Sequence, residues 1–399
     1  MSAATLQPLD PSSLREILEQ HTMFKARKAG GRLANLAYID LTDIKLEGVD
    51  LSDANLTGAR LYGASLRDAN FMRANLFGCD LRNADLRFAR LDRSDLRGAC
   101  LRGANLTAAS LIGADLREGQ IAFKDDKQGY RLMKHERRPG ELDYAILSGA
   151  DLSGAKMTGT MAVSTDFRDA NLSGAIMSHA KLRKANLDGA MLKGTDLSGA
   201  DVTGATLRDA VMEDTTTQGC NLREADTTGM LDAPISVFID DTPLEELLDL
   251  HEAWAKTGGA SGARQTICGV DFRLVRRLSQ RALPTLSAES SVFFGMDLQG
   301  IQLQGANLAG ADLRRTDLRG ADLRGAKLMG AKLAHARLEG AKLGPLDLGG
   351  GRLIRTDLTR AILSHADLTN ADLTRARMIE TVTEQVRDKG CNYTLTERE

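Results

Sequence analysis

The sequence predicts an all-β solenoid, in which short extended segments wind into a coil, together with short amphipathic capping helices. Three observations lead to this prediction: leucine recurs at every fifth position, alanine precedes it by two, and helix-like segments stand outside the regular repeats. Residues 317–338, for example, read DLRGADLRGAKLMGAKLAHARL. Self-similarity at a fixed period over most of a chain indicates stacked structural repeats.

A period of five fits neither of the regular elements. With the leucine at position i, five residues of an α-helix rotate the side chain by about 140°, so the leucines would spiral around the helix. In a β-strand, successive leucines would alternate between the two faces. The period therefore requires a turn within every repeat.

The positions around the leucine indicate how such a repeat folds. Position i−2 is alanine in most repeats, as at Ala54, Ala59 and Ala321. In an extended segment i−2 and i face the same way, so each repeat offers one small and one large inward side chain. Glycine is frequent at i+2, as at Gly58 and Gly320, where the missing Cβ eases a tight turn. Leucine and alanine would then fill the axis of a coil.

The repeats resemble the pentapeptide-repeat family, whose motif is A-(D/N)-L-x-x. The tripeptides that carry the resemblance are ANL at 54–56 and ADL at 84–86, 150–152 and 321–323. The resemblance implies a right-handed quadrilateral parallel β-helix with four repeats in each turn. Successive turns would pair as parallel strands about 4.8 Å apart.

Two interruptions divide the chain into three blocks of repeats. The regular positions run from Leu36 to Ile121, from Leu142 to Leu222, and from Leu298 to Met378. We expect an N-terminal capping helix in 1–33, block 1 in 34–121, an extruded loop or hairpin in 122–141, block 2 in 142–230, a helix with degenerate repeats in 231–297, block 3 in 298–378, and a tail or last cap with a short helix in 379–399. Residues 273–297 are too degenerate to be placed.

The two helical segments have the same design. DPSSLREILEQHTMFKARKAGG near the N-terminus and DDTPLEELLDLHEAWAKTGG in the second interruption both space their apolar residues at i, i+3, i+4 and i+7. Both place a histidine at i+7, His21 and His251, on the apolar face. Thr242 is expected to N-cap the second helix. We infer an internal duplication of helix plus solenoid, in which each helix covers a raw solenoid end.

The sequence offers little chemistry. It contains no HExxH, GxSxG or GxxxxGK[ST] motif. His335 and His365 lie six repeats apart, which would put them on opposite faces of the coil, where they could not share a metal. We therefore expect no enzyme, no catalytic residue, no metal and no cofactor.

Composition favours a cytoplasmic location and gives no sign of a membrane. The formal net charge is −2, the five cysteines form no CxxC pair, and no apolar run approaches the roughly 18 residues of a membrane span. The N-terminus lacks the features of a signal peptide.

Two surfaces are candidates for binding a partner. If residues 20 apart stack, Arg315, His335, Arg355 and Arg375 form one column in block 3, flanked by Arg314, Arg337 and Arg377. This strip could bind an anionic partner, or Asp317 and Asp357 could interleave and neutralise it. Block 3 carries a net charge of +5, against −1 for 34–121 and −4 for 142–230. The loop offers a second surface with Lys134, His135, Arg137 and Arg138.

A rigid, non-catalytic scaffold that binds an unknown protein partner through its loops and faces is the preferred function. The resemblance suggests an alternative, because some family members mimic DNA and bind DNA gyrase, although a basic block 3 departs from such mimicry. Binding of a polyanion by the basic strip is a third reading, and nucleic acid comes after protein as a partner. The oligomeric state is open: both solenoid ends could be capped, or one end could stack on a twin as a homodimer.

Overall fold

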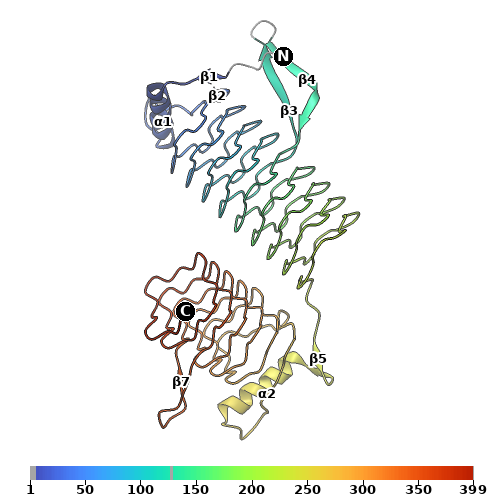
Figure 1. Ribbon diagram of the computed structural model, residues 1–399, viewed down its shortest axis with the longest axis vertical. Helices are drawn as coiled ribbons and strands as arrows, with labels where there is room; N and C mark the ends of the chain where they lie inside the picture. The colour runs from blue at the N-terminus through green and yellow to red at the C-terminus, as the bar shows by residue number, and fades with distance from the viewer. Residues whose placement is uncertain (1–5, 126–128, 399) are drawn as a thin grey trace. The chain divides into compact units, whose positions relative to one another are not determined.

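A computed structural model describes residues 6–125 and 129–398, without the side chains of 7, 8 and 120–138. The chain forms two compact units, unit 1 from Met1 to Ala233 and unit 2 from Pro234 to Glu399, and each is described by itself (Figure 1). Neither helix in the described residues has the length and apolar character of a membrane-spanning segment.

Most of each unit is a β-solenoid built from repeats of five residues. In most repeats one residue forms a parallel bridge to the residue 20 positions later, as in Asn35 to Asn55 and Asn55 to Asn75. The bridges are made by paired hydrogen bonds, such as Leu36 N–H to the Asn55 carbonyl at 2.7 Å and Asn55 N–H to the Ala34 carbonyl at 3.0 Å. Four repeats therefore complete one circuit, and the successive circuits are visible in Figure 1.

The core consists of the leucines at i and the small residues at i−2. Leu56 and Ala54 are both fully buried. Position i+2 takes a positive φ, both at glycines such as Gly58 (64°) and at other residues such as Asp53 (64°). Glycine is frequent there because it adopts this conformation without steric cost. Where threonine replaces alanine at i−2, its hydroxyl donates to a core carbonyl, as Thr165 does to Leu142 at 2.7 Å.

The predicted loop between blocks 1 and 2 is a hairpin extruded from one circuit. Strands β3 (Gly119–Asp125) and β4 (Gly129–Arg138) pair in antiparallel fashion, and residues 126–128 of the predicted loop lie outside the described residues. The coil resumes in register, because Cys100 bridges Glu141, 41 positions later. Block 1 was expected to reach Ile121, but this residue belongs to β3.

Helix α1 (Pro11–Lys25) covers the first circuit of unit 1. Asp10 caps it by accepting hydrogen bonds from the backbone of Ser12 and Ser13. Strand β1 (Gln7–Pro8) precedes the helix and pairs with β2 (Ile39–Asp40) in the first circuit. The buried His21 accepts the Ala34 N–H on Nδ1 at 3.1 Å. The helix is thereby fixed to the coil, as its predicted capping role requires.

Unit 2 begins with its own cap. Strands β5 (Phe238–Ile239) and β6 (Thr242–Pro243) form a short hairpin, and α2 (Leu244–Lys256) follows. The prediction that Thr242 caps this helix is wrong: Thr242 pairs within the hairpin, and Pro243 occupies the N-cap without a side-chain hydrogen bond. His251 accepts the Gln265 N–H on Nδ1 at 2.9 Å, as His21 does in unit 1.

The degenerate stretch 273–297 belongs to the coil. Thr266 bridges Ser287 and Asp271 bridges Val292, 21 positions later in each case, so the first circuit of unit 2 holds one extra residue. Phe272 and Phe293 stack inside it with their ring centroids 4.3 Å apart. From Ala282 to Asp322 the bridges return to the 20-residue spacing.

Block 3 contains a second extruded hairpin that the period conceals. Strands β7 (Leu346–Asp347) and β8 (Leu353–Ile354) pair in antiparallel fashion. Lys327 bridges Asp357, 30 positions later rather than 20, so residues 345–354 lie outside the coil. Leu348 and Leu353, although in phase with the repeat, are 49% and 42% exposed.

The C-terminal tail forms a last circuit instead of the predicted helix. Val382, Arg387, Asn392 and Glu397 each bridge the circuit before. Its centre is polar: the Tyr393 hydroxyl donates to Asp388 at 3.2 Å, and the Arg398 guanidinium lies 3.9 Å from the Tyr393 ring centroid. Polar side chains replace leucine at i, so this end of the solenoid needs no helix to hide an apolar core.

Candidate functional site

The predicted basic strip of unit 2 is divided between two sides of the coil. His335 donates its backbone N–H to Ser364, and His365 donates to Glu384, so the column reads Arg315, His335, His365. Arg355 follows the β7–β8 hairpin, and Arg375 pairs through its backbone with Thr394 on another side. The column of Arg315, His335, Arg355 and Arg375 is therefore wrong, because the hairpin adds ten residues between its second and third members.

Four of the predicted strip arginines are held in ion pairs. Arg314 pairs with Asp312 at 2.6 Å. Arg337 lies 3.3 Å from Asp317 and 3.2 Å from Glu339. Arg355 and Arg377 both reach Glu397, at 3.1 and 3.3 Å. Interleaved carboxylates therefore neutralise these arginines, although Glu397 takes part where Asp357 was expected.

A recurrent pairing explains the many arginines at i+1. An aspartate at i−1 accepts both the backbone N–H and the guanidinium of the arginine two residues later. In the pair of Asp322 and Arg324, Nη2 lies 2.6 Å and Nε 2.9 Å from the carboxylate. Desolvation by burial would raise the pKa of Asp322, but hydrogen bonds from Arg324 outweigh it and lower the pKa below its usual value. The same geometry recurs at Asp317 and Arg319. Such arginines stabilise a turn and are poorly placed to hold an anion.

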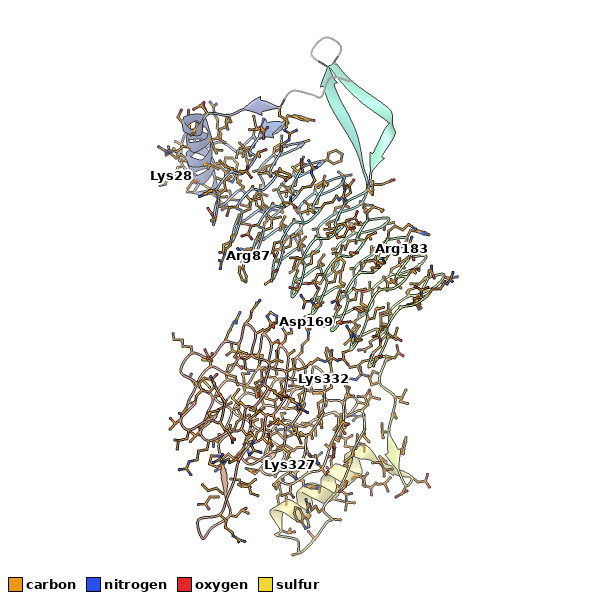
Figure 2. The ribbon with its side chains drawn as sticks, in the orientation of Figure 1. Lys28, Arg87, Asp169, Arg183, Lys327 and Lys332 are labelled. Atoms are coloured by element: carbon orange, nitrogen blue, oxygen red, sulfur yellow. The ribbon has the colours of Figure 1, made fainter. Side chains whose placement is uncertain are left out.

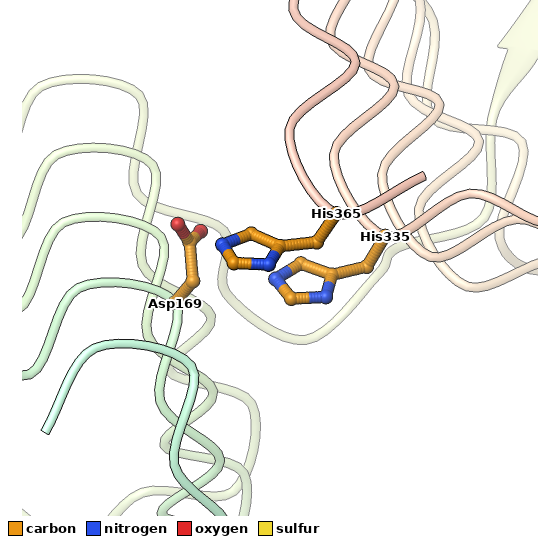
Figure 3. Close-up of side chains that lie close together, drawn as sticks. All are labelled: Asp169, His335 and His365. Carbon is orange, nitrogen blue, oxygen red and sulfur yellow. The ribbon is translucent and has the colours of Figure 1, made fainter. Parts of the chain in front are cut away.

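The imidazoles of His335 and His365 stack face to face, with ring centroids 4.7 Å apart and an interplanar angle of 6° (Figure 3). The prediction that they lie on opposite faces is wrong for the same reason as the strip. Two histidines alone are fewer ligands than a structural metal site uses. Among the described residues of unit 2, no third histidine, cysteine or carboxylate completes a set. Arg315, next in the column, adds a positive charge that disfavours a cation.

The second predicted surface lies on β4. Lys134, His135, Arg137 and Arg138 belong to this strand, and their side chains lie outside the described residues. The structure therefore places their backbone on an extruded hairpin. Their role as partner contacts remains a prediction.

The β7–β8 hairpin presents an apolar surface that the sequence prediction missed. Leu348, Leu353 and Ile354 are between 40% and 49% exposed. The turn between the strands contains Gly349, Gly350 and Gly351, all at positive φ, and Asp347 accepts the Gly349 N–H at 2.8 Å. At its base, the Cβ of Leu346 lies against Gly325, where an added Cβ would meet it at 2.7 Å.

One residue could have revealed this hairpin. Pro345 stands at position i+2, which takes a positive φ elsewhere in the coil, as at His335 (59°). Proline holds φ near −65°, so the coil cannot continue through it. Leu346 then stands at i−2, a position that most repeats of block 3 fill with a small residue such as Ala341.

Comparisons with known proteins agree with the repeat. A family model for pentapeptide repeats matches eight segments that together cover more than half of the chain: 34–71, 69–107, 99–119, 141–174, 165–204, 297–333, 306–344 and 346–378. No curated protein matches.

Among solved structures, the chain is similar to HetL, a pentapeptide repeat protein involved in heterocyst differentiation regulation in the cyanobacterium Nostoc sp. Strain PCC 7120. The identity is 31%, over 50% of this chain and 78% of that one, with a TM-score of 0.31. Rfr23 of the cyanobacterium Cyanothece 51142 is 24% identical over 35% and 90%, with a TM-score of 0.21. QnrB1, a plasmid-mediated fluoroquinolone resistance protein, is 18% identical over 50% and 89%, with a TM-score of 0.27.

Proposed function

Because this chain belongs to the pentapeptide-repeat family, whose fold is a β-helical solenoid, we propose that it is a non-catalytic interaction protein. In this proposal the coil is a rigid scaffold, and the β7–β8 hairpin is the contact for a protein partner. Repeat solenoids commonly act through extended surfaces and through segments that project from them.

The observation that carries the proposal is the exposed apolar hairpin. Residues 345–354 are not needed to complete a circuit, since Lys327 and Asp357 bridge around them. They nevertheless expose Leu348, Leu353 and Ile354. Exposed apolar side chains gathered on one projecting element are a feature of protein-binding surfaces. Ile354 also lies against Gly325 of the coil, whereas Leu348 and Leu353 are not part of the core, so a partner is the better reason for their exposure.

The absence of catalysis is part of the proposal. The carboxylates at i−1, which are the most abundant candidates for acid–base work, serve the turns: Asp85, Asp95 and Asp115 each bind the arginine two residues later. The two capping histidines accept backbone hydrogen bonds. The polyanion alternative finds no comparable support, because four of the six strip arginines are held in ion pairs and the strip is divided between two sides of the coil.

Excision of the hairpin tests the proposal. Deleting residues 345–354 joins Gly344 to Arg355 and restores a five-residue spacing between Leu343 and Leu358. Thr356 already occupies i−2, where its hydroxyl accepts the Gly325 N–H at 2.9 Å. We expect the variant to keep its β-rich circular dichroism spectrum and to lose the proteins that co-purify with the full chain.

A milder variant controls for the deletion. Replacing Leu348, Leu353 and Ile354 by serine keeps the triglycine turn and should also lose these proteins. A matched excision of 119–139, which leaves Glu118 at i+2 and Gly140 at i−2, removes the other hairpin with its predicted contacts on β4. If both β7–β8 variants fold and still retain every co-purifying protein, the hairpin is not the contact.

A further inference from the structure

The last turn of α1 and the turn that follows it in unit 1 carry only basic charge, whereas the first half of the cap also exposes Asp10, Glu16 and Glu19. We define cap 1 as residues 10–33, comprising α1 and the turn after it. Between residues 20 and 39 the chain has Lys25, Arg27, Lys28 and Arg32 and no aspartate or glutamate. Lys25 is held by Asp53 at 2.7 Å. In the part of the chain that the structure describes, the exposed side chains of the other three form no ion pair; Figure 2 marks Lys28 on this cap.

Apolar side chains accompany these basic residues. Phe24 at the end of α1 is 43% exposed, and Leu33, where the turn meets the first circuit, is 42% exposed. Cap 1 combines unpaired cationic groups with an exposed aromatic ring, as interaction surfaces commonly do.

The cap of unit 2 has the opposite charge. We define cap 2 as residues 234–256, comprising the β5–β6 hairpin and α2. Residues 234–255 contain six acidic residues and no lysine or arginine. Among the described residues, the exposed Asp240, Asp241, Glu245 and Glu246 form no ion pair. Two of them, Asp240 and Asp241, occupy the hairpin turn at φ of 47° and 64°.

Cap 2 also exposes apolar side chains beside its charges. Ile235 is 76% exposed and Phe238 is 62% exposed, both close in sequence to the acidic turn. Leu250 on α2 is 39% exposed. None of the three belongs to the stripe that seats α2 on the coil, which consists of Leu244, Leu248 and His251. They leave an apolar patch rimmed by negative charge.

We propose that cap 1 of one molecule binds cap 2 of a second copy of this chain. The second copy is identified by complementarity. Cap 2 exposes four acidic groups, and cap 1 three basic groups, that form no ion pair among the described residues, and each set is accompanied by an exposed phenylalanine. Opposite charges on two surfaces attract across solution and steer their encounter, and salt screens this attraction. Burial of Phe24 and Phe238 would stabilise the contact after encounter.

The pairing joins different surfaces of the two molecules. Every chain carries one cap of each kind, so two copies can satisfy both pairs in a closed dimer, or further copies can add in an open series. The residues that define the two caps do not overlap those of the β7–β8 hairpin, so variants of the caps and variants of the hairpin test the two proposals separately. One proposal can therefore fail without the other.

Sedimentation velocity of the full chain over a range of concentration and salt tests the pairing. The expected result is association that weakens as salt rises. Lys28→Glu with Arg32→Glu reverses cap 1, and Glu245→Lys with Glu246→Lys reverses cap 2. Each double variant should weaken association roughly tenfold or more, and an equimolar mixture of the two should restore it, because a reversed cap 1 then meets a reversed cap 2.

Further variants separate pairing from misfolding. Asp240→Asn with Asp241→Asn removes two charges and retains residues that tolerate positive φ, so weakened association cannot be ascribed to a melted helix. Phe238→Ser should weaken association with little change in its salt dependence. Arg183→Glu with Lys184→Glu, an equal reversal on the coil of unit 1 (Figure 2), should change nothing. A full chain that is monomeric under all conditions, or reversed variants that do not associate when mixed, would overturn the proposal.

Discussion

Unit 1 and unit 2 both begin with a helix whose histidine accepts a backbone hydrogen bond from the first circuit, and they differ in what else holds the helix. His251 also contacts the Pro284 carbonyl with Nε2 at 2.9 Å, whereas Nε2 of His21 is buried without a partner. Arg281 binds Asp249 and Glu252 of α2. In unit 1, Lys25 at the end of α1 forms a partly exposed ion pair with Asp53.

This difference shows which features the fold requires. Both units keep the helix, the histidine acceptor and the leucine–alanine core, and each extrudes a hairpin without losing register. They differ in the charge of the cap, the length of the hairpin and the composition of the last circuit. The shared features make a solenoid, and the variable ones are the surfaces on which we place the function.

The largest expected difference in stability lies between two leucines that share the five-residue period, one in the coil and one on the β7–β8 hairpin. Leu318 is fully buried in the coil, whereas Leu348 is 49% exposed on the hairpin. Leu318→Ala should lower the free energy of unfolding by about 2–5 kcal/mol, and Leu348→Ala should leave it nearly unchanged. Urea unfolding measures both variants. If the two variants lose the same free energy of unfolding, Leu348 is buried in the core and residues 345–354 do not form an exposed hairpin.

The two capping histidines should not be equivalent. His251→Leu leaves the Gln265 N–H and the Pro284 carbonyl without their partner, and we expect a loss of about 2–4 kcal/mol. His21→Leu leaves only the Ala34 N–H and removes an unpaired Nε2, so about 1–2 kcal/mol is expected. Thermal unfolding of each variant, with the other histidine intact, measures the difference. A larger effect at His21 would contradict the comparison.

The ion pairs that hold the caps should differ in the same direction. Arg281 has a side chain only 10% exposed, and Arg281→Met removes both of its bonds to α2, at a cost of about 1–2 kcal/mol. Lys25→Met breaks a pair near the surface and should cost below about 0.5 kcal/mol, since Arg73 remains bound to Asp53. High salt should reduce the smaller effect further. Equal unfolding midpoints for the two variants would show that Arg281 does not anchor α2.

Mild acid should loosen both caps. Burial lowers the pKa of His21 and of His251 below the usual 6.5. Each imidazole is neutral in the folded cap, where Nδ1 accepts a hydrogen bond. The unfolded chain takes up protons as pH falls below about 6.5 while the folded caps do not, so this contribution to stability is present at neutral pH and lost on acidification. The melting temperature should fall as the pH is lowered from about 7.5 to 5.5, and it should fall less in the His251→Leu variant. A slope unchanged in that variant would contradict the assignment.

The sequence alone predicts the coil because the rules of each repeat are local. Leucine at i, alanine at i−2 and glycine at i+2 act within one circuit, and the helices are marked by amphipathic spacing and a histidine at i+7. The hairpin in 122–141 follows from a break in the period. The last circuit was missed because its inward residues, such as Asp388 and Tyr393, are not leucine. The stretch 273–297 was missed because it buries Arg281 and Leu286 at i−2 and Ala288 at i.

The surface columns could not be predicted so well, since they depend on the number of residues in every circuit. Residues 345–354 follow the five-residue period but lie outside the coil. Because ten residues are half a circuit, every residue after them is displaced by half a circuit relative to the prediction. His365 thereby takes the place expected for Arg355 beside His335. Only Pro345, whose φ cannot become positive, contradicts the period in this stretch.

Cysteine cross-linking tests the central claim most directly, namely that the coil places residue 335 beside residue 365. Neighbouring strands lie about 4.8 Å apart, within the Cα separation of a disulfide. In a Cys268→Ser background, His335→Cys with His365→Cys should form a disulfide on mild oxidation, identified by mass spectrometry of the linked peptides. His335→Cys with Arg355→Cys should not. A cross-link between 335 and 355 alone would contradict this register, and with it the exposed hairpin on which the proposed function rests.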